Sequence, residues 1–449
     1  MLLTIEKLIY GGDGLARLPA DERGRGKAVF VPYVLAGETV EASLNQQKSS
    51  FARGKVQKII EASAHRVEPG CPYFVRCGGC HYQHASYEHQ LEIKKEILRE
   101  NLRRIAKLEL TCEVQAHPSP PWNYRNRSRL QVRLVPDFTM GYFMAGSHQV
   151  LPVERCPISS PLINRGIAAL WQAGRDGKAP AGLRDVELFA DFEDARLLVE
   201  ISCTAEARRN SVKAWAEEMR ALMPEIAGVA AFRDTKMSSA GWGQEKLVSL
   251  GDENLIYKTQ RANYRVSAGS FFQTNRHLTD ELVKIVTCGQ QGDLVLDLYA
   301  GVGLFSTALA CDFRHIVCVE PSQTAVADLQ YNLLQNGKAI QATAEQYLSA
   351  RHGGVAENST RSGSVEALPV AREPDLVIVD PPRSGLGERV ARGVADLGAS
   401  RIVYVSCDPA TLARDLVLLL AAGYRIESAH LVDLFPQTYH LETVMHLIR

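Results

Sequence analysis

The stretch DLVLDLYAGVG, residues 293–303, is a short apolar run that ends in a turn containing Gly301 and Gly303. The same pattern of an apolar run followed by a helix-like segment recurs in IVCVEPS (316–322), DLVIVDPPRSG (375–385) and IVYVSCDP (402–409). Short apolar strands that alternate with helices predict a parallel sheet with helices on both faces. We therefore expect an α/β, Rossmann-like domain in the C-terminal part of the chain.

Ligands of open α/β sheets bind at the carboxyl ends of the strands. A glycine turn at such an end lets a cofactor approach the backbone, and Glu320, at the end of the following strand, could accept both hydroxyls of a ribose. Ser306 stands where a dinucleotide enzyme would usually have a third glycine, which favours S-adenosylmethionine over NAD. A tight turn with a solvated glutamate is the alternative.

Two later strands end in residues that could carry chemistry. Asp380 begins DPPRSG, and Cys407 lies in SCDP, where Asp408 and Pro409 stop the strand at once. A thiol at the rim of a sheet can reach a substrate as a thiolate. A rigid Asp-Pro-Pro turn and an inert buried cysteine are the alternatives.

The first 62 residues are expected to form a small β module. Five short apolar or alternating runs are separated by turn signals such as GGDG at 11–14 and DERGRG at 21–26. This pattern suggests a partly closed, OB-like barrel, an architecture that often binds single-stranded nucleic acid. A purely structural barrel is equally compatible with these residues.

Three cysteines, Cys71, Cys77 and Cys80, fall close together in CPYFVRCGGCHYQH, residues 71–84. Their spacing is typical of metal ligands, but a fourth ligand is missing nearby. His81 or His84 would complete a zinc site. A helix is expected from about 86 to 107.

A further strand is expected in YRNRSRLQVRLV, from residue 124. Because side chains alternate along a strand, Arg125, Arg127, Arg129 and Arg133 would share one face. A one-sided run of arginines favours a phosphate-contact surface, with a solvated strand face as the alternative. We assign this strand and the cysteines to a central α+β region, residues 63–265, followed by the Rossmann-like domain at 266–449.

The composition is that of an ordinary globular chain of two to four domains, with 449 residues, 46% hydrophobic and 23% charged. Lys+Arg and Asp+Glu are both 51, so no overall charge indicates a polyanionic partner. The sequence has no run of about 20 apolar residues and no signal-peptide pattern, so we expect a cytoplasmic protein without a membrane partner. The stretch 352–374, rich in Gly, Ser and charge, is expected to be a surface insertion.

Taken together, the chain resembles the RNA uracil-5 methyltransferase family. The N-terminal barrel is similar to the TRAM module of that family. The matching motifs are SFFQTN (270–275), DLYAGVG (297–303), VEPS (319–322), DPPRSG (380–385), SCDP (406–409) and HLET (440–443).

The resemblance implies a class I methyltransferase fold and assigns roles to individual residues. It implies Cys407 as the nucleophile that attacks uracil C6 and Glu442 as the base that removes the C5 proton. It places Gln273, Tyr299, Glu320 and Asp380 around S-adenosylmethionine and Phe271 against the uracil. From the glycine turn we expect Gly301 to line the same cofactor site, and from the strand face we expect Arg127 and Arg129 to contact RNA. Without the resemblance, the sequence favours Glu442 as a surface carboxylate on the last strand.

For the cysteines the resemblance implies a [4Fe–4S] cluster, with Cys156 of the Cys156-Pro157 pair as the fourth ligand beside Cys71, Cys77 and Cys80. It also implies 23S ribosomal RNA as the substrate of a monomeric enzyme, with a transfer RNA uridine as the alternative. A non-catalytic RNA-binding protein is disfavoured because Cys407 and Glu442 are both present. Arg383 after the prolines argues against an exocyclic-amine methyltransferase, which would have an aromatic residue there.

Overall fold

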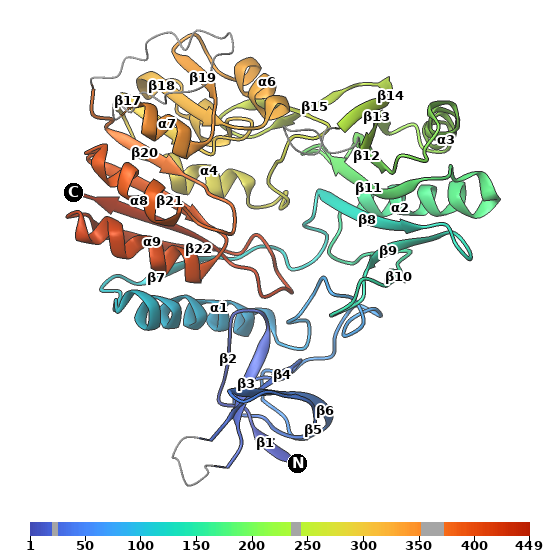
Figure 1. The fold of residues 1–449 in the computed structure, drawn as a ribbon, viewed down its shortest axis with the longest axis horizontal. Coiled ribbons are helices and arrows are strands. Elements are labelled where there is room, and N and C mark those ends of the chain that lie inside the picture. The colour runs from blue at the N-terminus through green and yellow to red at the C-terminus, as the bar shows by residue number, and fades with distance from the viewer. Residues whose placement is uncertain (20–25, 235–243, 352–371) are drawn as a thin grey trace.

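The computed structural model describes residues 1–19, 26–234, 244–351 and 372–449. Most of the expected insertion at 352–374, namely residues 352–371, lies outside the described residues. Within the described part, three sheets of six, seven and eight strands and one two-stranded hairpin make up the fold. Figure 1 shows the N-terminal sheet below helix α1, the seven-stranded sheet to one side and the eight-stranded sheet to the other.

The N-terminal module is a six-stranded sheet in the order β1-β5-β6-β4-β3-β2, around its own core of small aliphatic side chains such as Val29, Val31 and Val40. The first apolar run, LLTIEKLI at residues 2–9, forms two short strands instead of one. The chain changes partner between them, because the Ile5 N–H donates to the Glu38 carbonyl before β5 and the Glu6 N–H donates to the Leu15 carbonyl on β3. The strands are β1 (Leu2–Thr4), β2 (Lys7–Leu8), β3 (Asp13–Arg17), β4 (Ala28–Pro32), β5 (Thr39–Gln47) and β6 (Phe51–Glu61).

The central region contains the seven-stranded sheet in the order β10-β9-β8-β11-β12-β13-β14. Helix α2 begins at Pro161, where the Ser160 side chain caps the Ile163 N–H, and it packs with α3 against the sheet. The elements are β8 (Arg127–Arg133), β9 (Thr139–Phe143), β10 (Val150–Pro152), α2 (Pro161–Ala173), the π-helical turn η2 (Gly174–Lys178), β11 (Leu183–Ala190), β12 (Leu197–Cys203), α3 (Arg209–Leu222), β13 (Ile226–Asp234) and β14 (Gln244–Gly251).

The C-terminal sheet has the order β19-β18-β17-β20-β21-β23-β22-β7 and confirms the expected α/β class. Its strands run parallel except β23, which is antiparallel to both of its neighbours. Its strands are β17 (Gly292–Leu298), β18 (Phe313–Glu320), β19 (Gly337–Gln341), β20 (Leu376–Val379), β21 (Arg401–Ser406), β22 (Arg425–Val432), β23 (Glu442–Ile448) and β7 (Val114–His117).

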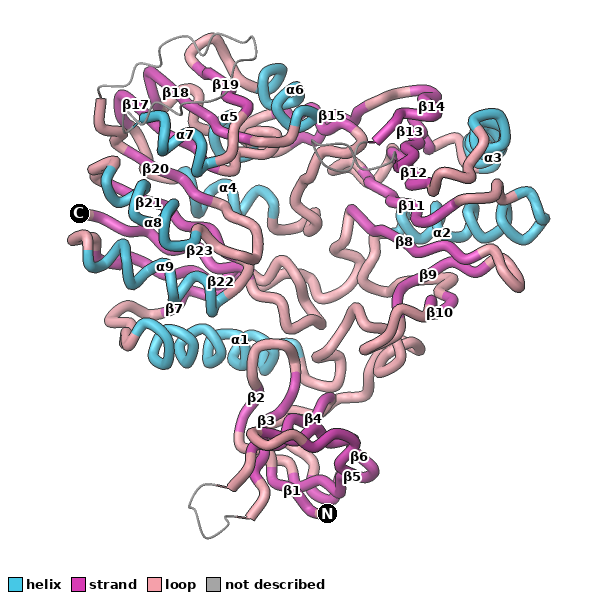
Figure 2. The backbone as a smooth tube through the Cα atoms, viewed as in Figure 1, coloured by secondary structure: helices cyan, strands magenta, loops and turns pink. Residues whose placement is uncertain are grey.

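Helices cover both faces of this sheet (Figure 2). Apolar side chains form a separate core on each face. Successive apolar strands are buried because both faces are covered. The helices are α4 (Thr279–Thr287), α5 (Leu304–Ala308), α6 (Gln323–Asn332), α7 (Ala344–Arg351), α8 (Gly387–Asp396) and α9 (Pro409–Ala421), and the hairpin before them is β15 (Asn254–Lys258) and β16 (Asn263–Ser267).

The segment between the N-terminal module and β8 belongs in space to the C-terminal sheet. Helix α1 (Tyr87–Asn101) and the π-helical turn η1 (Leu102–Ala106) share a core with α9, and β7 pairs with β22. The expected helix at 86–107 is present. It was assigned to the central region, residues 63–265, but it packs on the C-terminal sheet. The division of roles among 1–62, 63–265 and 266–449 stays a prediction. No helix of the described residues is long and apolar enough to cross a membrane.

Candidate active site

The strand register brings four of the predicted site residues to one edge of the C-terminal sheet. Leu298, the last residue of β17, is paired with Val319 on β18 and Val379 on β20. Tyr299, Glu320 and Asp380 therefore follow at the same level, and Cys407 follows the neighbouring strand β21. This is the carboxyl edge of the strands. The strand order changes direction at β17, because β18 and β19 lie on one side of it and β20 and β21 on the other, and ligands of such sheets bind at this point.

The glycine turn after β17 is shaped around Glu320. The carboxylate of Glu320 accepts hydrogen bonds from the backbone N–H of Gly301 at 3.0 Å and of Ser322 at 2.8 Å. A Cβ at Gly301 would meet nothing within 4 Å, so this side of the turn is open to a ligand. At Gly303 the φ of +89° favours glycine, and a Cβ there would also lie 2.7 Å from Leu329 Cδ1, so that side chain would have to shift. The turn and its carboxylate thus fit a ribose-bearing cofactor.

Cys407 and Glu442 lie near each other where β21 and β23 meet the sheet edge. The last registered pair of the two antiparallel strands is Ser406 with Thr443, and Cys407 and Glu442 are the next residues outward. The charge of Glu442 acts on the Cys407 thiol, in agreement with this proximity. Asp408 caps α9 by accepting the N–H groups of Ala410 and Thr411, which ends the strand at Cys407.

Burial and nearby acids control the protonation of this pair. Burial raises the pKa of the Cys407 thiol to about 12, with Glu442 and Asp380 adding to the shift and Arg383 opposing it. Burial raises the pKa of Glu442 well above its usual range, again with Asp380 adding and Arg383 opposing. Burial, reinforced by the charge of Asp297, raises the pKa of Asp380 to about 7. The edge is therefore an acidic, desolvated site that holds protons.

The segment after β16 supplies the remaining predicted contacts. Phe271 is 64% exposed, whereas Gln273 is 7% exposed and its amide has no hydrogen bond among the described residues. The segment is anchored because Ser270 donates to Asp328 at 2.7 Å and Arg127 donates to the Ser270 carbonyl at 2.5 Å. It thus presents a solvent-facing aromatic ring beside a buried amide without a partner.

Three residues of the site were missed by the sequence analysis. The Tyr10 hydroxyl, from the N-terminal module, donates to the Cys407 carbonyl at 3.0 Å. Arg383 is the cation that opposes the proton affinity of both Cys407 and Glu442. Asp297 is 1% exposed, and burial raises its pKa to about 7. Arg383 and Asp297 lie inside the quoted motifs, but nothing in the N-terminal sequence indicates the role of Tyr10.

The expected arginine face exists on β8, but it is covered by carboxylates. Arg127 forms an ion pair with Glu187 and is only 11% exposed. Arg129 pairs with the same Glu187 at 2.9 Å, and it remains 45% exposed. Arg125 lies before the strand and Arg133 near its end. The acids come from β11 and β12, so their approach could not be read from the β8 sequence, and a phosphate-contacting role for these arginines stays a prediction.

The four predicted cluster cysteines line one cavity of about 50 Å³. The backbone at Cys156 is held by its N–H, which donates to Asn164 Oδ1 at 2.8 Å. The backbone at Cys77 is held by an isolated β-bridge to Met144. Among the described residues, no three His, Cys, Asp or Glu side chains are arranged to hold one metal ion. Four sulfurs around a zinc would lie about 3.8 Å apart. The cavity brings together the four cysteines that the family resemblance groups, and a metal or cluster role for them stays a prediction.

Comparisons with known proteins agree with the fold. The profile of the tRNA (uracil-5-)-methyltransferase family matches residues 86–449, and that of the TRAM domain matches residues 1–57. An uncharacterized RNA methyltransferase of Aquifex aeolicus is 32% identical over 98% of this chain and 97% of its own. Another, from Caldanaerobacter subterraneus, is 32% identical over 98% of this chain and 96% of its own.

Among solved structures, the tRNA (uracil-54, C5)-methyltransferase of Pyrococcus abyssi, in complex with S-adenosyl-L-homocysteine, has a similar fold. It is 24% identical, with a TM-score of 0.71 over the full length of both chains. At this identity the likeness concerns the fold.

Proposed function

This chain belongs to the tRNA (uracil-5-)-methyltransferase family, and from that premise we propose that it methylates C5 of a specific uridine in 23S ribosomal RNA through Cys407 and Glu442. The chain is an S-adenosylmethionine-dependent RNA uracil-C5 methyltransferase with an N-terminal TRAM domain. The proposal adds the substrate, the two catalytic residues and action as a monomer in the cytoplasm.

The observation that carries the catalytic assignment is that Cys407 and Glu442 are the next residues beyond the last registered pair of β21 and β23, close enough for the charge of Glu442 to raise the pKa of the Cys407 thiol. Uracil C5 is a weak nucleophile, so Cys407 first loses its thiol proton to solvent, Sγ bonds to C6, and the electron pair of the C5=C6 bond moves onto the enolate. C5 would then take the methyl group of the cofactor, whose methyl–sulfonium bond breaks to leave S-adenosylhomocysteine. Glu442 next removes the C5 proton, C5=C6 forms again and the Sγ–C6 bond breaks. Glu442 acts in its ionised form, and the raised pKa makes that carboxylate a stronger proton acceptor than an exposed one.

The cofactor would be held by groups of the same edge. Glu320 has lone pairs left for ribose hydroxyls, the open face of Gly301 admits the ligand, and Gln273 offers a buried amide without a partner. We assign Tyr299 and Asp380 to the same binding site from their level in the sheet. When bound, S-adenosylmethionine supplies the electrophilic methyl group.

RNA would approach from the side of Phe271. A uridine in folded RNA has to leave its base stack to reach a buried thiol, and the exposed Phe271 ring can stack on the extruded uracil. The exposed part of Arg129 is available for a phosphate, with Arg127 behind it as the more buried member of the pair. The TRAM domain adds a further RNA-binding surface.

We propose a [4Fe–4S] cluster held by Cys71, Cys77, Cys80 and Cys156, supported by the shared cavity. The cluster would cross-link the cysteine-rich segment, residues 71–84, to the chain around Cys156, and we assign it a structural or RNA-contacting role. The test is the iron and acid-labile sulfide content of anaerobically purified protein. Four irons per chain, lost in Cys156→Ser, are expected, whereas zinc or no metal would contradict the proposal.

A transfer RNA uridine is the second candidate substrate. It is favoured by the description of the matching family and by the transfer RNA named for the Pyrococcus abyssi structure. The enzyme would be incubated with unmodified 23S ribosomal RNA or with unmodified transfer RNA and methyl-labelled S-adenosylmethionine, and the label mapped by mass spectrometry. Label at C5 of uridine in 23S RNA supports the proposal. Label in transfer RNA alone replaces the substrate, and label elsewhere than C5 contradicts the reaction.

A further inference from the structure

The loop between β22 and β23, residues 433–441, leads directly into Glu442 and contains a strained residue. Gln437 has φ of +69°, a left-handed conformation that is unfavourable for a residue other than glycine. Its side chain is buried, with 4% exposure. Such a conformation persists only where the surroundings determine it, so its partners indicate what the strain serves.

Four hydrogen bonds hold Gln437, and none of them comes from the β22–β23 hairpin itself. Its N–H donates to Gln90 Oε1 at 2.9 Å, and its Oε1 accepts from Gln90 Nε2 at 3.0 Å. Its carbonyl accepts the N–H groups of His81 at 2.8 Å and Tyr82 at 2.9 Å. His81 and Tyr82 directly follow Cys80, so the cysteine-rich segment and α1 meet at this one residue.

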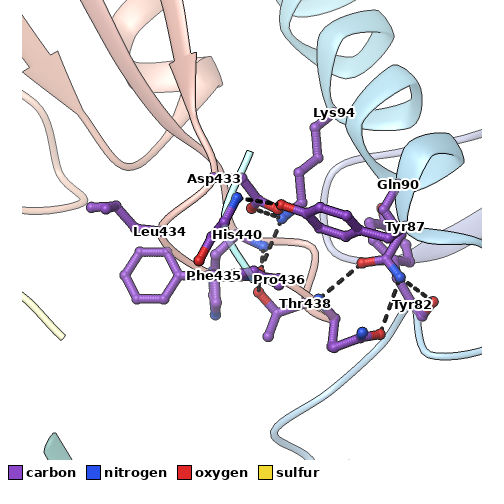
Figure 3. A network of polar contacts seen from close by, with 12 residues as sticks. Tyr82, Tyr87, Gln90, Lys94, Asp433, Leu434, Phe435, Pro436, Thr438 and His440 are labelled. Carbon is purple, nitrogen blue, oxygen red and sulfur yellow. Dashed lines mark hydrogen bonds and ion pairs between the residues drawn. The ribbon is translucent and has the colours of Figure 1, made fainter. Parts of the chain in front are cut away.

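A second attachment from α1 holds the start of the same loop. Lys94, one turn after Gln90, is fully buried and donates to Asp433 at 2.6 Å and to the Phe435 carbonyl at 3.0 Å. Figure 3 shows both α1 side chains reaching toward this loop. Burial lowers the pKa of Lys94, and Asp433 opposes that shift. A buried ion pair adds little net stability, so this one is better explained by the geometry that it imposes.

The other member of the catalytic pair is held by different contacts. Cys407 is fixed by the Asp408 cap of α9 and by the hydrogen bond from Tyr10. The Tyr10 ring also packs edge-on against Tyr439 of the loop. The hydrogen bonds that hold Gln437 and Asp433 are nevertheless distinct from those that hold Cys407, so losing the contacts of Gln437 should displace the base more than the nucleophile.

We propose that Gln437 is a positioning residue, through which Gln90 of α1 and the backbone after Cys80 fix the carboxyl of Glu442 for the elimination step. The inference rests on the proposed function, since it needs Glu442 as the base. In that step the C5 proton passes to Glu442, the C–H electron pair forms C5=C6, and the Sγ–C6 pair returns to Cys407. Addition of Cys407 and methyl transfer come earlier and do not require the base to be in position.

The test uses the full-length holoenzyme with Gln90→Met, which keeps the side-chain length and removes both contacts with Gln437, together with the hydrogen bonds from Gln90 to the Tyr82 and Ala85 carbonyls. Glu96→Met is the matched control, because Glu96 is exposed on the same helix without a partner among the described residues. We expect kcat to fall about 10–100-fold while the steady-state fraction of covalent protein–RNA adduct rises. The affinity for S-adenosylmethionine and the KM for RNA should stay within about twofold of those of the control.

A second variant guards against misfolding. Gln437→Gly adopts the left-handed φ without strain and keeps all three backbone hydrogen bonds, so it should fold and accumulate adduct to an intermediate level. A fall in kcat with no rise in adduct, in step with a lower Tm, would show a merely structural role and overturn the proposal. The proposal would also be overturned if Gln90→Met and Gln437→Gly both showed the kcat and the adduct level of the wild type.

Glu442→Gln, measured in parallel, separates this proposal from the proposed function. If adduct accumulates in Glu442→Gln but not in Gln90→Met, only the positioning role of Gln437 is refuted, and Glu442 remains the base. Adduct in neither would refute Glu442 as the base, and the positioning proposal would fail with it.

Discussion

At the scale of single residues, the site is defined by three buried carboxyls and one cation. Asp297, Asp380 and Glu442 are linked by mutual repulsion, and Arg383 opposes the proton affinity of Glu442. Their raised pKa values reflect desolvation, which a sequence cannot show because it depends on what covers each strand. Asp380 could be predicted from local pattern because it directly follows an apolar run, whereas Glu442 was predicted only from the family resemblance and Asp297, inside β17, was missed.

Asp297→Asn should stabilise the free protein, and more so at higher pH. Burial raises the folded-state pKa to about 7 from 3.8, so the unfolded chain loses its proton first and native stability falls as pH rises between these values. The gain for the variant should be about 2 kcal/mol larger at about pH 8 than at about pH 5. Urea unfolding at both pH values measures it.

Asp396→Asn, on the exposed side of α8, is the control and should show no such pH dependence. An Asp297→Asn gain that is equal at both pH values would mean that this carboxyl is not held protonated by burial.

At the scale of elements, β8 shows what a strand pattern can predict. The alternation that puts Arg127, Arg129 and Arg133 on one face is present, with Leu130 and Val132 buried on the other. The carboxylates opposite them are about 60 residues away in sequence on β11 and β12, so the neutralisation of the face could not be foreseen. A pattern within one strand indicates which residues share a face but not what faces them.

Arg127 and Arg129 should therefore respond differently to substitution. Arg127→Met leaves the 11%-exposed Glu187 with one partner fewer and should lower the free energy of unfolding by about 2–3 kcal/mol. Arg129→Gln should cost less than about 1 kcal/mol. If Arg129 contacts a phosphate, its loss also reduces the slope of log K against log salt for RNA binding by about 1.

Urea unfolding and RNA titrations at several salt concentrations measure these effects. An unchanged salt slope in Arg129→Gln would remove β8 from the RNA-contacting surface.

At the scale of the whole molecule, distant parts of the chain converge on one sheet edge. Tyr10 reaches Cys407 from the N-terminal module, and the backbone after Cys80 reaches the loop before Glu442. The sequence motifs predicted the C-terminal sheet, the N-terminal module and the main site residues, because each is encoded in local pattern. The connections between modules depend on single long-range contacts, which have no local signature.

Tyr10→Phe tests the connection from the N-terminal module. Loss of the hydroxyl leaves the Cys407 carbonyl without that donor, which should cost about 1 kcal/mol of stability. The rate of adduct formation in a single turnover should fall about threefold to tenfold, because the nucleophile is less firmly held. Tyr439→Phe is the control, since its ring packs on Tyr10 but its hydroxyl makes no hydrogen bond among the described residues. Equal rates in the two variants would contradict the positioning of Cys407 from the N-terminal module.

The central claim is that Cys407 and Glu442 act in sequence on one uridine, and the adduct formed by Glu442→Gln tests it most directly. After incubation with substrate RNA and S-adenosylmethionine, Glu442→Gln should retain RNA in a denaturing gel as a covalent complex that already carries the methyl group. Cys407→Ser in the same background should give none. A Glu442→Gln enzyme that turns over normally, or an adduct that persists without Cys407, would contradict the account.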